Sequence, residues 1–351
     1  MKKSLIAAAV VAALPAFAQA QTNVTMYGIV DASVNVIDLG ENSRNALVVG
    51  TGTMSTSRWG VRGSEDLGGG LKAIFQLEAE VGVDDGANNS GAFWQRTAQV
   101  GLSGGFGTVK LGRGYTPAFR MHGTWDALSY GLFNNLQTAT VPHGAGGADT
   151  AQTRFSNGIY YDSPSFGGVT INAAYQAGEA TDETTTDRSS GEGWDISVGY
   201  KGGPLHIGGY YQVTKDTTLQ ANETERYGIG GGYQFGAFKL VAGYSESDPD
   251  LAGLDGYSAA SIGAVMKLGT GSIHAQYIAL GNEDQSNADA DALALAYVHP
   301  MSKRTNLYAQ FGITKNDDNG TFGMRTGQES FLADAPGSDV KGFGVGVRHV
   351  F

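Results

Sequence analysis

The closing segment of the chain, Lys341–Phe351, alternates between two kinds of side chain. One set is Phe343, Val345, Val347, His349 and Phe351, and the other is Gly342, Gly344, Gly346, Arg348 and Val350. A period of two is what a β-strand imposes on its two faces. The pattern predicts a strand with one apolar, aromatic face and one face of glycine plus a cation. Alternation alone does not say which face meets water.

The N-terminus predicts an exported protein. Residues Met1–Ala20 carry Lys2 and Lys3, then an apolar stretch, then the small-x-small sequence Ala18-Gln19-Ala20. This pattern is typical of a signal peptide that is cleaved from the mature chain. We expect residues 1–20 to be removed and residues 21–351 to form one domain. No later run approaches the roughly 18 apolar residues that a spanning helix needs, so a membrane-spanning chain must cross with strands.

The alternation recurs along the whole mature chain. Strand-like runs include Val24–Val36, Ser57–Glu65, Gln95–Ser103, Thr108–Arg113, Arg154–Asp162 and Val169–Gln176. Connections are alternately short and glycine-rich, or long and polar, as in the stretch Lys315–Gly337. An even number of strands with short turns on one side and long loops on the other is typical of outer-membrane barrels. We predict an all-β, 16-stranded antiparallel transmembrane β-barrel. The alternative, a soluble propeller or sandwich, would not sort its loops into two sets.

One connection differs from the other long loops. Residues 116–152 contain an apolar set: Phe119, Trp125, Leu128, Tyr130, Leu132, Phe133 and Leu136. Connections longer than roughly 12 to 15 residues are usually functional. We expect this third long loop to fold into the lumen, rest on the wall and narrow the channel. Thr124 is placed to cap a short helical turn within it. The alternative is a loop that covers the outer mouth or a neighbouring subunit.

Charge is unevenly distributed. The chain has 34 acidic and 23 basic residues, a formal net charge of -11, yet most acids fall in the long polar connections. On the strands, arginines occupy faces that do not meet lipid: Arg58, Arg62, Arg96, Arg154 and Arg348. Guanidinium groups that stay charged at any working pH attract anions in a pore. The alternative is that these arginines pair with Asp31, Glu78 or Glu80 and hold the wall together.

Motifs for catalysis and cofactor binding lack their structural context. Gly101-Leu102-Ser103-Gly104-Gly105 fits G-x-S-x-G, but it lies at a tight turn between strands rather than before a helix. The histidines show no zinc-site spacing. We predict no enzyme activity and no cofactor. Acidic stretches such as Asn316–Gly320 and Asp84–Gly86 offer oxygen ligands for weakly bound divalent cations, but they lack EF-hand spacing.

Several motifs match a known family. Tyr27-Gly28, the run Arg58–Gly63, the run Gly107–Arg113 and the run Arg154–Asn157 stand at corresponding strands, and the chain ends in Phe351. The chain resembles the Gram-negative general diffusion porins, most closely the β-proteobacterial type. In that family, wall arginines face carboxylates of an inward third loop across the narrowest point.

The resemblance implies a set of site residues. We assign to the pore constriction Arg58, Arg62, Arg96, Arg154, Glu78, Asp31 and Asp126. Asp126 is the first choice for the loop carboxylate and Asp149 the second. The family's C-terminal assembly signal corresponds to Phe351.

The resemblance also implies location and partners. We expect export through the periplasm to the outer membrane, where the chain would meet lipid, lipopolysaccharide and the barrel-assembly machinery and form a homotrimer. The expected function is passive diffusion of small hydrophilic solutes, with anions preferred and no nucleic acid bound. The alternatives are a substrate-specific porin with a solute-binding site and a barrel that serves mainly as an adhesin or receptor.

Overall fold

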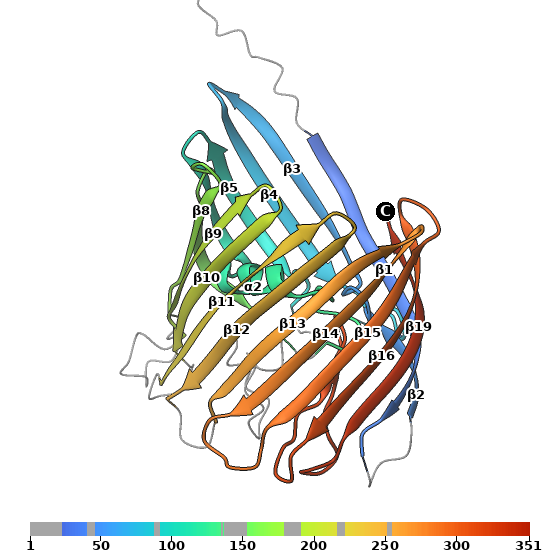
Figure 1. Ribbon diagram of the computed structural model, residues 1–351. Helices are drawn as coiled ribbons and strands as arrows, with labels where there is room; N and C mark the ends of the chain where they lie inside the picture. Colours follow the sequence, from blue (N-terminus) through green and yellow to red (C-terminus); the bar gives the residue numbers. More distant parts are fainter. Residues whose placement is uncertain are drawn as a thin grey trace, which may run out of the picture.

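The computed structural model describes residues 23–40, 46–87, 92–134, 136, 153–178, 191–215, 222–250 and 255–351. The predicted signal peptide, residues 1–20, and the second candidate carboxylate, Asp149, lie outside these residues. Slanting strands surround a hollow interior, with short turns at one end and long connections at the other (Figure 1). Among the described residues, no helix is long and apolar enough to cross a membrane.

The strands follow one another around the wall. The first half contains β1 (Asn23–Asp38), β2 (Ala46–Thr51), β3 (Arg58–Gly68), β4 (Leu71–Glu80), β5 (Thr97–Gly104), β6 (Gly107–Tyr115), β7 (Arg154–Asp162), β8 (Val169–Gln176) and β9 (Gly193–Gly202). The second half contains β10 (Leu205–Lys215), β11 (Glu223–Phe235), β12 (Phe238–Pro249), β13 (Tyr257–Leu268), β14 (Gly271–Asn282), β15 (Ala290–Pro300), β16 (Thr305–Asn316) and β19 (Val340–Val350). The predicted strands Arg154–Asp162 and Val169–Gln176 are confirmed with the same bounds.

The sheet closes on itself through the two ends of the chain. β1 pairs antiparallel with β19, with Val30 opposite His349 and Val34 opposite Val345. Gly28 and Phe351 exchange backbone hydrogen bonds of 3.1 Å in both directions. Closure leaves no unpaired edge, which lipid would not tolerate because it cannot hydrogen-bond free backbone groups. The closing strand therefore pairs with the first strand of the chain.

The count of sixteen strands depends on one interrupted strand. The main sheet contains 17 segments because both β2 and β3 pair with β1. β2 pairs with the second half of β1 and β3 with the first half, so β2 and β3 are two parts of one barrel strand. The result is the predicted 16-stranded antiparallel barrel.

Asp31 fixes the interruption between β2 and β3. Its carboxylate accepts backbone N–H groups of Met54 and Ser55 at 3.1 and 2.8 Å, and its backbone exchanges hydrogen bonds with the Ser57 hydroxyl. The Tyr308 hydroxyl donates to the same carboxylate at 2.6 Å. Asp31 is fully buried. Its observed contacts therefore hold the wall together.

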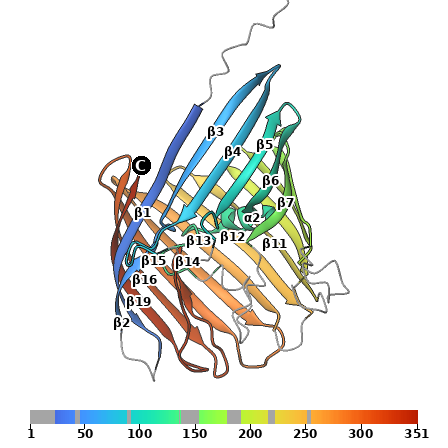
Figure 2. The ribbon, with the colours of Figure 1, turned by 180° about the vertical axis from the view of Figure 1, so that it is seen from behind.

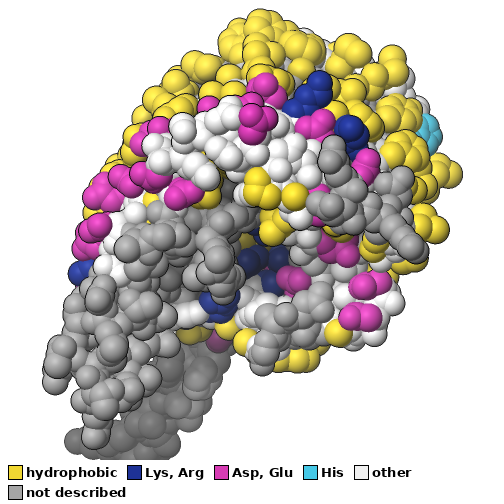
Figure 3. Space-filling view, turned by 90° about the horizontal axis from the view of Figure 1, so that it is seen from below, with side chains coloured by type: hydrophobic (Ala, Val, Ile, Leu, Met, Phe, Trp, Pro, Cys, Tyr) yellow, Lys and Arg dark blue, Asp and Glu magenta, His cyan; other side chains and the backbone are white. Residues whose placement is uncertain are grey.

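The two faces of the strands are separated as predicted. On β19, Phe343, Val345 and Val347 are 53%, 47% and 43% exposed on the outer surface, whereas Gly342 and Gly344 are buried inside. Hydrophobic side chains cover the outer wall, and Lys and Arg side chains gather within the opening (Figure 3). The aromatic face therefore meets acyl chains, and the glycine face, with Arg348, looks inward.

The third long loop folds inward, as predicted. It begins with α2 (Pro117–His122) and η1 (Gly123–Trp125), and both views place α2 inside the barrel (Figures 1 and 2). The helix starts earlier than expected: Thr116, not Thr124, is the N-cap, and its hydroxyl accepts the Phe119 N–H at 3.3 Å. Loop residues and wall residues share one hydrophobic core that includes fully buried Trp125.

The connection after β16 differs from the polar outer loop expected for Lys315–Gly337. It contains β17 (Met324–Arg325) and β18 (Ser330–Phe331), and β17 forms a backbone bridge to Asn134 of the third loop. Met324 is 1% exposed and packs with Phe133. The composition of this stretch is polar, yet its apolar residues Phe322 and Met324 are buried in the core shared with the third loop.

Candidate pore constriction

Neighbouring strands bring the predicted wall residues together. Arg58 begins β3, Glu78 lies on β4, Arg96 directly precedes β5, and Arg154 begins β7. In the ladder, Gly60 stands opposite Glu78 and Arg58 opposite Glu80, so the charges share the inward face. This register places Arg58 near Glu78 and Glu80, while Arg96 reaches Glu78 through an ion pair and Arg154 stands opposite Tyr115 on β6.

The arginines of the group differ in their partners. Arg96 is 3% exposed, its Nε lies 2.8 Å from Glu78 Oε1, and its Nη1 lies 3.6 Å from Glu80 Oε2. Arg58 Nη1 is 3.9 Å from the same Glu78 oxygen, at the limit of an ion pair. Two carboxylates therefore compensate Arg96, whereas the Arg58 charge is only weakly compensated.

Arg154 and Arg62 lie against tyrosine rings. The Arg154 guanidinium is 4.0 Å from the ring centroid of Tyr115, and that of Arg62 is 5.0 Å from the centroid of Tyr27. Neither arginine forms an ion pair within 4 Å among the residues that the structure describes. Stacking on an aromatic face orients a guanidinium and leaves its charge uncancelled. Both groups therefore project positive charge from the wall.

Tyr115 and Tyr27 connect these arginines to Glu78. The Tyr27 hydroxyl donates to Glu78 Oε2 at 2.9 Å and accepts from Gln76 Nε2 at 2.6 Å. Arg96 donates to the Tyr115 hydroxyl. Glu78 thus accepts from both Tyr27 and Arg96, which leaves little of its charge for solutes.

Asp126 does not occupy the position predicted for it. Its carboxylate accepts the backbone N–H groups of Leu128 and Tyr130 at 2.7 and 2.8 Å, which stabilises a turn in which Ser129 and Tyr130 have positive φ. Burial raises its pKa to about 6. Within the described parts of the chain, no arginine lies within 4 Å of this carboxylate. Asp126 therefore shapes its own loop rather than facing the wall arginines, because nearby backbone donors capture it.

Asp195 anchors the loop and was missed in the sequence. It lies on β9 and accepts the Ala118 N–H at the start of α2, with 3.0 Å to each oxygen, and the Gln212 amide at 2.8 Å. A carboxylate at a helix N-terminus is favoured by the exposed N–H groups there. An acid at an inward position of the strand was the available signal, but its partner lies 77 residues away in the chain.

Two glycines of the wall, Gly230 and Gly243, contact Trp125 of the loop and are called the glycine seat below. A Cβ on Gly230 or Gly243 would lie 2.3 or 2.4 Å from the indole of Trp125. Trp125 is 0% exposed and stacks parallel to Tyr210 with 6.1 Å between ring centroids. Any side chain at these two positions would clash with the indole, so only glycine leaves space for the Trp125 ring against the wall. Some of the many glycines in the sequence therefore make room for the inward loop. The alternating pattern of the strands did not predict this role.

A stack of rings joins the wall arginine to the loop. Tyr115 lies 4.7 Å from Phe119, and Phe119 lies 4.5 Å from Tyr130, with nearly parallel planes in both pairs. His122 lies beside Tyr130, and burial lowers its pKa to about 3, so it is neutral. Among the loop residues that the structure describes, this stack presents aromatic rings and a neutral imidazole where the family pattern predicted a carboxylate.

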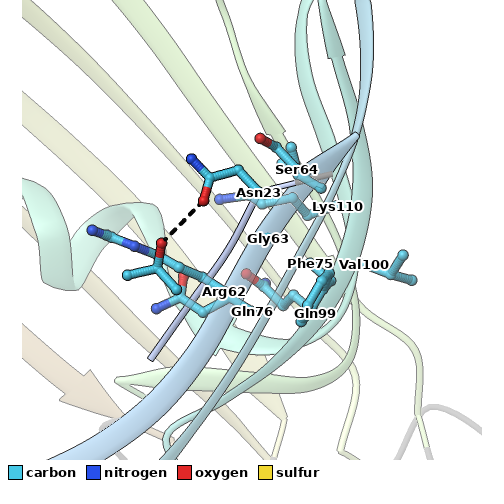
Figure 4. Close-up of a pocket in the computed structure, with 11 residues that line it drawn as sticks. Asn23, Arg62, Gly63, Ser64, Phe75, Gln76, Gln99, Val100 and Lys110 are labelled. Atoms are coloured by element: carbon cyan, nitrogen blue, oxygen red, sulfur yellow. Dashed lines mark hydrogen bonds between the residues drawn. The ribbon is translucent and has the colours of Figure 1, made fainter. Parts of the chain in front are cut away.

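A recess lies on the wall toward the short-turn end. Its volume is about 410 Å³, and its polar lining includes Arg62, Gln76, Gln99, Asn23 and Lys110 (Figure 4). The side chains come from β1, β3, β4, β5 and β6. Lys110 is paired with Asp162 at 2.9 Å. Arg62 therefore contributes positive charge to this recess, between the constriction and the short turns.

The geometry defines a class of protein. A closed barrel with an apolar outer wall, a polar interior and an inward loop is a transmembrane pore. The sequence matches the family model described as Gram-negative porin over residues 7–319. The chain belongs to this family, and it is therefore an outer-membrane diffusion channel and not an enzyme.

Curated relatives and solved structures agree with this assignment. Outer membrane porin protein 32 of Delftia acidovorans is 36% identical, and the alignment covers 100% of both chains. An outer membrane porin protein of Bordetella pertussis is 30% identical over 100% of both chains. The solved structure of an anion-selective porin from Comamonas acidovorans superposes with a TM-score of 0.84 at 33% identity, covering 94% of this chain and 100% of that one.

Proposed function

We propose that this porin passes small hydrophilic solutes by passive diffusion and favours anions. The observation that carries the proposal is the imbalance at the constriction. Arg58, Arg62 and Arg154 present weakly compensated or uncompensated guanidinium groups, while Asp126 of the facing loop is bound to its own backbone. Fixed cations along a water-filled pore lower the energy of a passing anion and raise that of a cation. The similar porin from Comamonas acidovorans is described as anion-selective.

The short-turn end of the lumen supports the same preference. Lysines lie at inward positions of the wall strands near the short turns: Lys72, Lys110, Lys201, Lys239 and Lys267. Most carboxylates, by contrast, lie at the opposite end, in the long connections. The net charge of -11 therefore does not describe the charge that a solute meets inside the pore.

We assign different roles to the predicted constriction residues. Arg58, Arg62 and Arg154 bias the selectivity, because their charges are the least compensated. Arg96 and Glu78 form a buried pair that fixes the wall beside them. Asp31 fixes the β2–β3 interruption, and Asp126 fixes the loop turn.

A planar-bilayer recording in a salt gradient tests the proposed function. We expect a reversal potential with the sign of anion preference and an ohmic, non-saturating current. A reversal potential of the opposite sign contradicts the charge argument. Saturable flux that a particular solute blocks would instead show a substrate-specific porin, and a chain that conducts little would be mainly an adhesin or receptor.

We also propose a homotrimer. On the outer side of β3, Trp59 packs with Phe93 and Trp94 at centroid distances of 6.1 and 5.4 Å, and Phe93 is 57% exposed. An exposed aromatic cluster on a connection outside the barrel suits a contact between subunits. Light scattering of the detergent-extracted protein should give the mass of three chains, and a single-chain mass would refute the trimer.

The remaining partners follow from location. We propose that the outward face meets outer-membrane lipid and lipopolysaccharide, and that Phe351 is recognised by the barrel-assembly machinery. In support, Phe351 is 43% exposed at the end of the chain. Its ring lies against Gly28, where a Cβ would be 2.3 Å from the ring.

A further inference from the structure

The turn between β17 and β18 inserts into the gap between β2 and β3. The Gly327 N–H donates to the Thr53 carbonyl at 3.3 Å. The side-chain oxygen of Gln328 accepts the Ser57 N–H and the Thr51 hydroxyl, both at 3.3 Å. Because Thr51 ends β2 and Ser57 directly precedes β3, hydrogen bonds hold the turn at both edges of the gap.

The same hairpin supports the third loop. Arg325 forms a backbone bridge with Asn134 of the loop, and Met324 packs with Phe133. The Leu132 N–H donates at 2.9 Å to the gap carbonyl that also accepts from the hairpin. The hairpin and the loop therefore share one anchor on the wall, and a displaced hairpin would remove part of the support of the loop.

One carboxylate at the hairpin turn is poorly compensated. Glu329 is half-buried, and its Oε2 lies over Gly50 of β2, where a Cβ would be 2.8 Å from this oxygen. Within the part of the chain that the structure describes, Oε2 is buried without a hydrogen-bond partner. Burial, and next the negative charge of Asp84 in the β4–β5 connection, raise the pKa of Glu329 to about 7, although the Thr51 N–H bonds to the carboxylate.

Other charged groups border the gap. Asp31 of β1 holds backbone N–H groups of the gap from the opposite side. Arg58 begins β3 where the gap ends, and Arg325 lies on the hairpin itself. Of these charges and Asp84, the carboxylate of Asp84 acts most strongly on Glu329. The turn thus brings two carboxylates together at the point where it meets the wall.

We propose that the β17–β18 hairpin is a proton-dependent latch on the third loop, which stays docked while Glu329 carries a proton and loosens when this carboxyl ionises. The ionised form is disfavoured in the docked state because one oxygen is buried without a donor and a second negative charge lies nearby. Docking is therefore strongest below about pH 4.5, the ordinary pKa of this carboxyl, and weakens as pH rises through about 7. The proposal concerns regulation of the pore and rests on its function as a diffusion channel.

A spin label on the hairpin tests the latch directly. The chain has no cysteine, so Ser330→Cys gives a single attachment site on β18, and Ser286→Cys gives a matched exposed site on the β14–β15 connection. The full chain would be labelled and reconstituted in lipid vesicles. Between about pH 6 and about pH 8, the ratio of mobile to immobile S330C signal should rise about tenfold, less than the limit of about a hundredfold for one proton because Glu329 is partly exposed. The S286C signal should stay unchanged.

Two further variants separate Glu329 from the other acids. E329Q keeps the size of the side chain and removes its titration, so the S330C label should stay immobile at both pH values. D84N removes the nearby negative charge, so the rise in mobile signal should be smaller than in wild type. Asp31 and Asp126 are present in both variants, so their own titration cannot produce these differences. Heat-modifiable migration on gels verifies that each variant is a folded barrel.

Single-channel recording links the latch to the pore. Wild type should show larger fluctuations of the open-channel current at about pH 8 than at about pH 6, and E329Q should not. An S330C signal that does not change with pH would overturn the proposal, and so would an equal change in E329Q. Label movement without any change in current would refute control of the loop by the hairpin. The label reports on the hairpin whether or not the pore favours anions, so a failed latch is distinguishable from a failed function.

Discussion

At the scale of single residues, identical side chains have different functions because their partners differ. Arg96 is buried between two carboxylates, whereas Arg154 lies on the face of Tyr115. Asp126 was predicted to face the wall arginines, but its carboxylate accepts hydrogen bonds from backbone N–H groups of its own loop. A buried ion pair chiefly compensates its own desolvation, so such residues contribute little field to the pore.

The first prediction concerns Arg58 and Arg154, whose charges are weakly compensated or uncompensated. R58Q/R154Q should shift the reversal potential toward cations, because a guanidinium about 4 Å from a passing ion contributes about 1 kcal/mol in water-like surroundings. Because the charge acts with opposite sign on anions and cations, each permeability changes about fivefold and the anion-to-cation ratio about 25-fold for each charge. K341Q removes one cation from the outer surface and should leave the ratio unchanged. An equal shift in K341Q and R58Q/R154Q would mean that total charge, not the constriction, sets selectivity.

The second prediction concerns pH and Asp126. Its pKa is about 6 in the folded chain and 3.8 when unperturbed, so the folded state binds the proton more tightly. Its contribution to stability is therefore present below about pH 4 and lost as pH rises to about 6, by about 3 kcal/mol at most. Urea unfolding in detergent should show a larger loss of stability between about pH 4 and pH 6 in wild type than in D126N. E65Q, which changes an exposed carboxylate, should retain it; a flat profile in wild type would contradict the argument.

At the scale of elements, three segments far apart in the chain hold the constriction loop. The Thr53 carbonyl, in the gap between β2 and β3, accepts from Leu132 of the loop at 2.9 Å and from Gly327 at 3.3 Å. Asp195 holds α2, and Gly230 with Gly243 receives Trp125. These wall residues fix the position of the loop, and the loop position in turn sets the width of the channel.

The third prediction tests the glycine seat. Gly243→Leu should push Trp125 off the wall, since adding volume to a packed site costs about 1–3 kcal/mol, and single-channel conductance should change as the loop moves. Ala242→Leu places the same side chain on the lipid face of the same strand and should conduct as wild type. Trp125→Ala in the G243L background should restore part of the original conductance, because it vacates the space. Unaltered conductance in G243L would show that the loop does not depend on this seat.

At the scale of the whole molecule, closure of the barrel depends on its two ends. β1 and β19 pair along most of their length, and Phe351 completes the seam through Gly28. The backbone groups along this seam are thereby paired, which meets the main requirement for a strand-built span at the point where the chain ends join. The bonds between Phe351 and Gly28 are backbone bonds, so the phenyl ring does not contribute to strand pairing. The ring is therefore available for the proposed role in assembly.

The fourth prediction separates assembly from stability. Phe351→Ser should greatly reduce the amount of folded, heat-modifiable barrel in the outer membrane, while the purified chain should still refold in detergent, because the backbone bonds to Gly28 remain. Phe343→Ser changes another exposed phenylalanine on the outward face of the same strand. Equal losses in both variants would show a general need for apolar surface rather than a terminal signal.

Part of this protein is determined by local sequence. Strand position, the two faces and the inward direction of Arg58, Arg154 and Arg348 all follow from a period of two, because each depends only on neighbours in the chain. The apolar content of residues 116–152 likewise indicated a loop packed on protein. The family motifs added the constriction group of Arg58, Arg96, Arg154 and Glu78.

Only the tertiary structure decided how the inward loops pack against the wall and which charges are paired. Asp195 and Gly243 contact the loop across long sequence separations, and residues 324–331 turned inward although their composition is polar. Which carboxylate cancels which arginine depends on distances of an ångström or two, which no periodicity encodes. The sequence by itself thus determined a closed barrel with a cationic wall, and the packing of loop against wall decided which of its charges reach the water.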